Sequence, residues 1–239
     1  MRAYKFLGHG GVGRFSDFAW PLPSGGAAGS WVEAGGPVTE CVSGVHACRA
    51  PDLPEWIDDE LWEVELDGTI DERDVMVVGE RGRLIRRVEE WSSALATEFA
   101  ESCAWRTREF ALRALRREGQ HDQADSLAAA EDLPDMQARA VVSAVGGTGV
   151  AATAAAFAAD AVALARGRRP ETWDLGVPAA GPLPEQSPGA TAANLAFVVA
   201  HTAGLDAVAE NGEQAAYASG FAAERAWQVR WLTERLRLA

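Results

Sequence analysis

Polar side chains interrupt the apolar faces of the helices predicted near the end of the chain. On a helical wheel with about 100° per residue, these polar groups fall inside or beside apolar arcs: Asn194, His201, Glu224, Gln228 and, at the border of its arc, Asp160. A buried polar group without a partner costs about 1–3 kcal/mol of stability. We therefore expect them to point into one interior space, where His201 and Glu224 could exchange protons or bind a metal. The alternative is an ordinary core network in which Glu224 pairs with a cation such as Arg225.

A second group of candidates points to a pocket at the junction of a β-rich and a helical part. The chain has nine tryptophans, and indole rings are common both in binding sites and in plain cores. We expect a tryptophan-lined pocket there, with His46 or His201 as acid or base. The candidate substrate-binding residues are Trp20, Trp31, Trp56, Arg49, Asn194, Trp227 and Gln228.

Cys41, His46 and Cys48 bring soft metal ligands together within one short segment. Structural zinc sites usually take four ligands, often from close Cys-x-x-Cys pairs, and a fourth ligand is missing here unless His9 supplies it. A buried strand with a hydrogen-bonded histidine is favoured, and no metal is assigned.

Gly8 to Gly13 match the pattern G-x-G-x-x-G, which in dinucleotide-binding folds precedes a helix. In residues 14–20 the hydrophobic pattern alternates as in a strand and is broken by Pro21, so no helix is predicted after the glycines. This pattern favours a flexible turn. A phosphate-cradling loop of another kind stays open.

Acidic residues gather between Asp52 and Asp74, where eleven carboxylates are opposed only by Arg73. Glu63, Glu65 and Asp67 share one strand face, and such a row of oxygens could hold Ca²⁺ or Mg²⁺. A solvated edge strand is the favoured alternative.

The elements that must position these residues divide the chain in two. Period-two alternation and turn signals predict about six or seven strands up to residue 90, including 2–7, 14–20, 30–33, 45–49, a strand ending at Gly68, 75–78 and 81–88. Helical spacing then begins near Val88 and predicts a helix to Arg117, followed by helices at 122–130, 134–145, 150–166, 190–209 and 213–236. The predicted fold is α+β: a β-rich domain over 1–90, then an alanine-rich helical bundle over 91–239. A Pro/Gly-rich crossover at 167–189 resembles a lid.

Composition excludes several classes of function. The formal net charge of −13 opposes binding to a nucleic-acid backbone. Two charge-free stretches, 140–159 and 187–205, are rich in small residues and suit packed soluble helices better than membrane spans. The three cysteines show no pattern typical of disulfide pairing, and the N-terminus lacks the apolar segment of a signal peptide. Both features predict a cytoplasmic protein.

The segment Ser43-Gly44-Val45-His46-Ala47-Cys48-Arg49, with the strand Leu61 to Gly68, resembles an uncharacterised bacterial and phage family marked by a Gly-Val-His-x-Cys strand. This resemblance covers about residues 1–90 and implies no established activity. A weaker likeness to ADP-ribosyltransferase-type folds implies an NAD cleft, although a catalytic glutamate motif is missing. The helix from Tyr217 to Leu236 is similar to alanine-rich immunity-like domains.

Two functional hypotheses follow. The first is a small-molecule-binding protein that acts through the junction pocket as an enzyme of bacterial metabolism, with specialised metabolism included. The second is a noncatalytic immunity-type protein that binds a protein partner. The sequence demands no cofactor, and a homodimer and NAD binding stay open.

Overall fold

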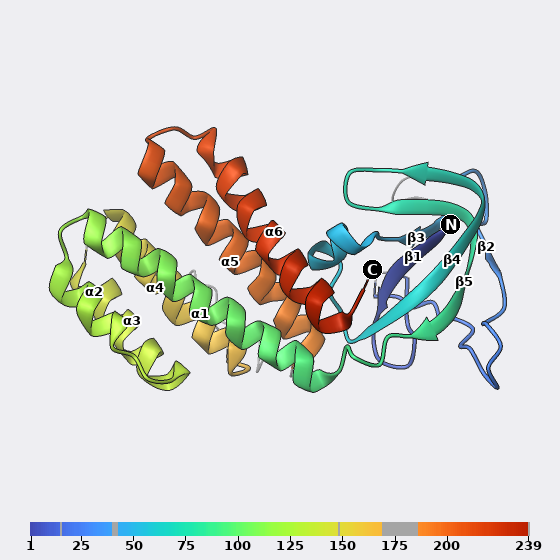
Figure 1. The fold of residues 1–239 in the computed structure, drawn as a ribbon, viewed down its shortest axis with the longest axis horizontal. Helices are drawn as coiled ribbons and strands as arrows, with labels where there is room; N and C mark the ends of the chain where they lie inside the picture. Colours follow the sequence, from blue (N-terminus) through green and yellow to red (C-terminus); the bar gives the residue numbers. More distant parts are fainter. Residues whose placement is uncertain (15, 40–42, 148, 169–185, 239) are drawn as a thin grey trace. The chain divides into compact units, whose positions relative to one another are not determined.

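The computed structural model describes residues 1–14, 16–39, 43–147, 149–168 and 186–238. The chain forms an N-terminal antiparallel sheet followed by helices, so the predicted α+β class is confirmed (Figure 1). It divides into two compact units, one formed by Met1–Ala96 with Gln228–Ala239 and the other by Thr97–Trp227. Most of the predicted crossover, residues 169–185, and the zinc candidate Cys41 lie outside the described residues.

The sheet of the first unit has five strands in the order β1-β4-β5-β2, with β3 also paired to β5. All pairings are antiparallel. The strands are β1 (Arg2–Leu7), β2 (Val32–Glu33), β3 (Val45–Ala47), β4 (Glu60–Glu72) and β5 (Val77–Arg87), with a short 3-10 helix, η1 (Ala50–Glu55), between β3 and β4.

Strand β4 shows why the sheet has this register. Trp62, Val64 and Leu66 are buried in the sheet core, whereas Glu63 and Glu65 alternate to the other face. A strand with two-residue periodicity buries one face in this way.

Three details of the predicted sheet are wrong. Residues 14–20 form no strand within the described residues, and Val12 only makes an isolated bridge to Ala19. Residues 75–78 and 81–88 are not two strands, because Val77–Arg87 is continuous. Gly68 does not end β4: with φ +78 it sits at a register shift between Asp67 and Ile70, and the strand continues.

The six helices are close to the predicted ranges (Figure 1). They are α1 (Ser93–Arg117), α2 (His121–Ala128), α3 (Leu133–Gly146), α4 (Gly149–Ala165), α5 (Pro188–Asn211) and α6 (Ala216–Leu236). Side chains cap three of them within the described residues: Ser92 accepts from Leu95 N, Asp132 from Asp135 N, and Ser187 from Ala190 N. Gly212, in the left-handed region with φ +70, ends α5.

The charge-free stretch 140–159 is not one helix, because α3 ends at Gly146 and α4 begins at Gly149. Among the described residues, α5 is the one helix long and apolar enough to cross a membrane by length and composition. Half of its apolar window is buried inside the protein, and the core helix of a soluble protein passes the same test. A soluble protein therefore fits these helices.

Candidate functional site

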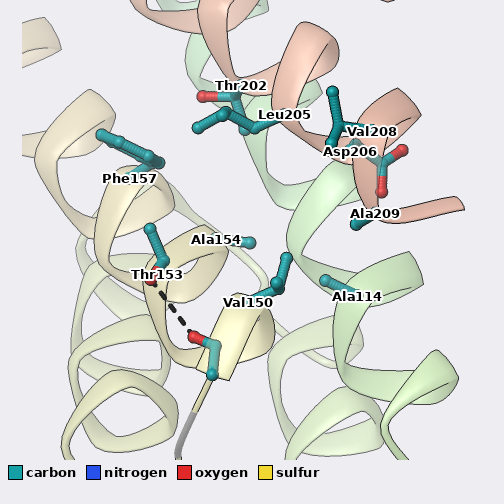
Figure 2. A pocket seen from close by; sticks show the side chains of 11 residues that line it. Ala114, Val150, Thr153, Ala154, Phe157, Thr202, Leu205, Asp206, Val208 and Ala209 are labelled. Carbon is teal, nitrogen blue, oxygen red and sulfur yellow. Dashed lines mark hydrogen bonds between the residues drawn. The ribbon is translucent and has the colours of Figure 1, made fainter. Parts of the chain in front are cut away.

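A cavity of about 440 Å³ lies between α1, α4 and α5 of the helical unit (Figure 2). Its lining residues are Ala114 from α1, Gly149, Val150, Thr153, Ala154 and Phe157 from α4, and Thr202, Leu205, Asp206, Val208 and Ala209 from α5. A cavity of this size falls in the range of small-molecule sites, about 300–1,000 Å³. The walls are mostly apolar, which is also typical of such sites.

Small residues explain why this space exists. Where Ala114, Ala154 and Ala209 face the cavity, no long side chain crosses it (Figure 2). Larger apolar side chains, among them Phe157 and Leu205, form the rest of the wall. The alanine-rich composition of α4 and α5 thus lets the helices pack and still leaves a pocket.

The two threonines of the wall are held by their own helices. Thr153 Oγ1 donates to the Gly149 carbonyl at 3.2 Å (Figure 2). Thr202 Oγ1 donates to the Val198 carbonyl at 2.8 Å. Each hydroxyl proton is therefore used inside the protein, and the hydroxyl oxygens can still accept a bond. The cavity offers a ligand little polar recognition from these side chains.

One wall of the cavity carries a charge cluster. Asp206 is 7% exposed, and its Oδ2 accepts from Arg113 Nε at 3.0 Å and from Arg113 Nη2 at 2.8 Å. Its Oδ1 accepts from Arg117 Nη2 at 3.1 Å. Two guanidinium groups from α1 thus share one carboxylate from α5, and the cluster has an excess of one positive charge.

His201 lies next to the cavity rather than in its wall. Its ring meets Phe157 edge-on with centroids 5.8 Å apart and stacks against Phe197 at 6.1 Å. Its Nδ1 is 2.8 Å from the Tyr217 hydroxyl. A Cβ on Gly204 would come within 2.6 Å of the Tyr217 ring, so glycine at this position gives the tyrosine room beside α5.

Glu224, expected to share a proton with His201, has a different partner. Its carboxylate accepts from Arg106 Nε at 2.6 Å and also from Arg106 Nη2. No hydrogen bond joins Glu224 to His201 among the residues that the structure describes. The proton-sharing pair is therefore absent from this geometry, and the partner of Glu224 is Arg106 rather than Arg225.

The other inward-facing candidates also have separate surroundings. Asn194 Nδ2 donates to Gln186 Oε1 at 3.1 Å in an exposed position. Gln228 is fully buried and belongs to the first unit, while Asp160 is 5% exposed within α4. Burial was predicted correctly for Gln228 and Glu224, whereas one shared interior space is not seen in these contacts.

Arg49 and Trp56, two predicted substrate-binding residues, hold the turn between β4 and β5. Arg49 Nη2 donates to the carbonyls of Arg73 and Asp74 at 2.7 and 2.6 Å. Trp56 Nε1 donates to the Val75 carbonyl at 2.6 Å. These side chains satisfy backbone acceptors of the turn, which is a structural role.

The remaining tryptophan candidates contact cations of their own units. Trp20 lies under Lys5 Nζ at 5.0 Å, and Trp227 lies under the Arg106 guanidinium at 4.3 Å. The ring of Trp31 faces both Arg81 and Arg83, at 4.9 and 4.5 Å. Each contact fits a cation–π interaction.

His46 lies in β3 beside a buried amine and a buried thiol. Its Nδ1 is 3.1 Å from the Gly44 carbonyl, and its own carbonyl accepts from Lys5 Nζ at 2.6 Å. Burial raises the pKa of the Cys48 thiol, so Cys48 stays protonated near neutral pH and is a poor metal ligand. Within the described residues no group of three His, Cys, Asp or Glu side chains is arranged to hold a metal ion.

The glycine-rich turn binds an anion supplied by the chain itself. Gly10 N donates to Glu60 Oε1 at 3.1 Å, and Gly11 N donates to Glu60 Oε2 at 3.0 Å. Trp62 Nε1 donates to the same carboxylate at 3.2 Å. Both glycines have φ +74, so successive N–H groups converge on the Glu60 carboxylate, which occupies the turn.

The carboxylate row on β4 is neutralised by arginines of β5, and β4 is not an edge strand. The cross-strand pairs are Glu63 with Arg86, Glu65 with Arg83, and Asp67 with Arg81. Strand β4 lies between β1 and β5. The interpretation as a solvated edge strand is therefore wrong. The carboxylates pair with arginine guanidinium groups at the positions where the other hypothesis expected Ca²⁺ or Mg²⁺.

Sequence reasoning missed the cavity and its charge cluster. A usable signal was present, because Arg113 and Arg117 are four residues apart on one predicted helix face and Asp206 interrupts an otherwise apolar helix. The cavity itself had no signal, since alanines predict close packing and not a space. No protein-family model, curated protein or solved structure matches this chain.

Proposed function

We propose that the helical unit binds a small, mainly apolar organic molecule in the cavity between α1, α4 and α5. The observation that carries the proposal is the cavity itself, about 440 Å³ in volume and lined by alanine, valine, leucine and phenylalanine side chains. Burying apolar ligand surface there is favourable by about 25 cal/mol per Å². The threonine hydroxyl protons and the Asp206 carboxylate already have partners in the protein, which favours a ligand with few polar groups over a sugar or nucleotide.

Binding is proposed here rather than acid–base catalysis. Glu224 is bound by Arg106, and His201 is bound to Tyr217, so the two candidates do not form the acid–base pair that such a mechanism would use. The junction pocket, an enzymatic activity, a protein partner, a homodimer and a cytoplasmic location stay predictions.

Titration with a neutral fluorescent probe, N-phenylnaphthylamine, tests the proposal. The probe brightens when it leaves water, so wild-type protein should give a saturable signal. Ala154→Leu places extra bulk in the cavity and should abolish that signal (Figure 2). Ala222→Leu makes the same change at an exposed position of α6 and should bind as wild type does. No saturable binding by wild type, or equal binding by Ala154→Leu, would overturn the proposal.

A further inference from the structure

We infer that the molecule bound in this cavity carries a carboxylate or similar anionic group, which pairs with Arg113 and Arg117 at the Asp206 wall. This inference rests on the proposed function and names the class of ligand: an amphiphile with one apolar chain and one anionic end.

The two arginines contact a residue of the cavity wall. Asp206 lines the cavity, and both guanidinium groups contact its carboxylate. The two guanidinium groups are therefore separated from the mostly apolar cavity only by the Asp206 side chain. The Arg113 guanidinium also lies 4.7 Å from the Phe110 ring, which helps to fix it in place.

The charges of this cluster do not balance. One carboxylate cannot neutralise two guanidinium groups, so the cluster keeps one positive charge. Such an excess is conspicuous in a chain with a net charge of −13. An anionic ligand group would complete the neutralisation, whereas a cationic group would add to the excess.

Asp206 leaves some of the arginine donors unused. Arg113 gives Nε and Nη2 to Asp206, and its Nη1 donates to none of the residues that the structure describes. Its side chain is 50% exposed and lies outside the cavity lining, so it is open to an oxygen of a ligand whose polar end extends past Asp206. Asp206, by contrast, already accepts three hydrogen bonds and offers little to a ligand donor.

Displacement of the neutral probe by three molecules of equal chain length tests the inference. The competitors are decanoate, decanol and decylamine, each used below its micelle-forming concentration near neutral pH. Decanoate should bind about fivefold more tightly than decanol, the ratio typical of a partly exposed ion pair. Decylamine should bind more weakly than decanol, and added sodium chloride should reduce the advantage of decanoate only.

Arg113→Gln should remove most of the advantage of decanoate over decanol. The matched control is Arg116→Gln, on the same helix, since Arg116 pairs with Asp125 and does not contact Asp206. Decanol binding by the variant shows whether it has kept its cavity.

Three outcomes would overturn the inference: equal binding of decanoate and decanol, tighter binding of decylamine, or an advantage of decanoate that persists in Arg113→Gln. In each of these the cavity still binds a chain, and the proposed function stands. If none of the three competitors displaces the bound probe, this inference falls, whereas the proposed function is still decided by probe binding to wild type and to Ala154→Leu. If Arg113→Gln does not fold, the ranking of the three competitors on wild-type protein decides alone.

Discussion

Glu224 on α6 and Arg106 on α1 form a bidentate ion pair between residues 118 positions apart in the chain. The Glu224 side chain is 1% exposed and that of Arg106 is 33% exposed. Trp227 and Phe110 flank the guanidinium, with ring centroids 4.3 and 5.8 Å away. The pair therefore joins two helices of one unit at a point where a buried carboxylate needs a cation.

Removing the cation of this pair should destabilise the protein strongly. Arg106→Leu leaves the Glu224 carboxylate buried without a partner and should lower the free energy of unfolding by about 3 kcal/mol. Urea denaturation followed by circular dichroism measures this change. The double variant Arg106→Leu/Glu224→Leu should recover part of the loss, because it removes the buried charge as well.

Arg108→Leu is the control for that experiment, since Arg108 pairs with Glu109 and the Glu109 side chain is 50% exposed. It should cost less than about 1 kcal/mol. A double variant that is less stable than Arg106→Leu would contradict the explanation by an unpaired buried charge.

The sequence predicted part of this site. Helical periodicity placed Glu224 and Gln228 on a buried face, and both are buried. It could not identify Arg106, because the partner of a buried charge depends on how distant helices pack rather than on local periodicity. The same limit applies to Asp206, whose arginines come from α1.

The fold shows a similar division between local and distant information. Ranges of strands and helices with strong periodicity were close to those observed, as β1 and α3 illustrate, although α1 begins at Ser93 and not near Val88. The order of strands and the bulge at Gly68 were not predictable, because both depend on pairing between segments. The alternating residues 14–20 satisfied the strand pattern without becoming a strand, since the turn around Gly11 and Gly13 takes their backbone hydrogen bonds instead.

Glu60→Gln should loosen the glycine-rich turn. An amide in place of the carboxylate offers one acceptor oxygen where Gly10 and Gly11 donate to two, so one N–H loses its partner. The loss should lower the free energy of unfolding by about 1–3 kcal/mol. Hydrogen exchange at the amides of Gly10 and Gly11 should also become faster. The control Glu90→Gln changes an exposed glutamate of the same unit, and unchanged exchange in Glu60→Gln would show that the carboxylate does not hold the turn.

The Glu65–Arg83 pair should make a small contribution that depends on pH and salt. The hydrogen bond from Arg83 Nε, at 2.8 Å, lowers the pKa of Glu65 below its ordinary value. A depressed pKa in the folded state stabilises the protein above the unfolded pKa, and this effect is lost as pH falls through the folded pKa. Glu65→Gln should therefore cost less than about 1 kcal/mol near neutral pH, and the cost should shrink in acid and in molar salt. Thermal melts of wild type and Glu65→Gln at several pH values, from neutral to acid, measure the difference in stability. A cost of the substitution that grows in acid would contradict the lowered pKa of Glu65.

Lys5 is the only lysine of the chain, and its amine should titrate well below the usual pH. Its Nζ donates to the His46 carbonyl and lies over Trp20, and burial lowers the pKa from 10.5 to about 8. Reductive methylation with isotopically labelled formaldehyde gives one lysine signal besides that of the N-terminus. Its chemical shift should change with a midpoint near pH 8, whereas a midpoint near the ordinary value would contradict the burial of the charge.

The same shift predicts how stability depends on pH. Between about pH 8 and 10.5 the unfolded chain keeps the Lys5 proton that the folded protein has released, so the unfolded state binds more protons. The contribution of this group to stability must then rise with pH across that window and level off above it.

Burial raises the pKa of Cys48 and Cys103 and so acts in the opposite direction, which is why wild type alone does not isolate the effect of Lys5. Lys5→Met keeps the chain length and removes only the titration, and both cysteines remain in the variant. The free energy of unfolding of wild type minus that of Lys5→Met should therefore increase from pH 7.5 to about pH 10 in urea titrations. A difference that stays constant or falls over this range would mean that the Lys5 ammonium is no costlier in the folded protein than in the unfolded chain.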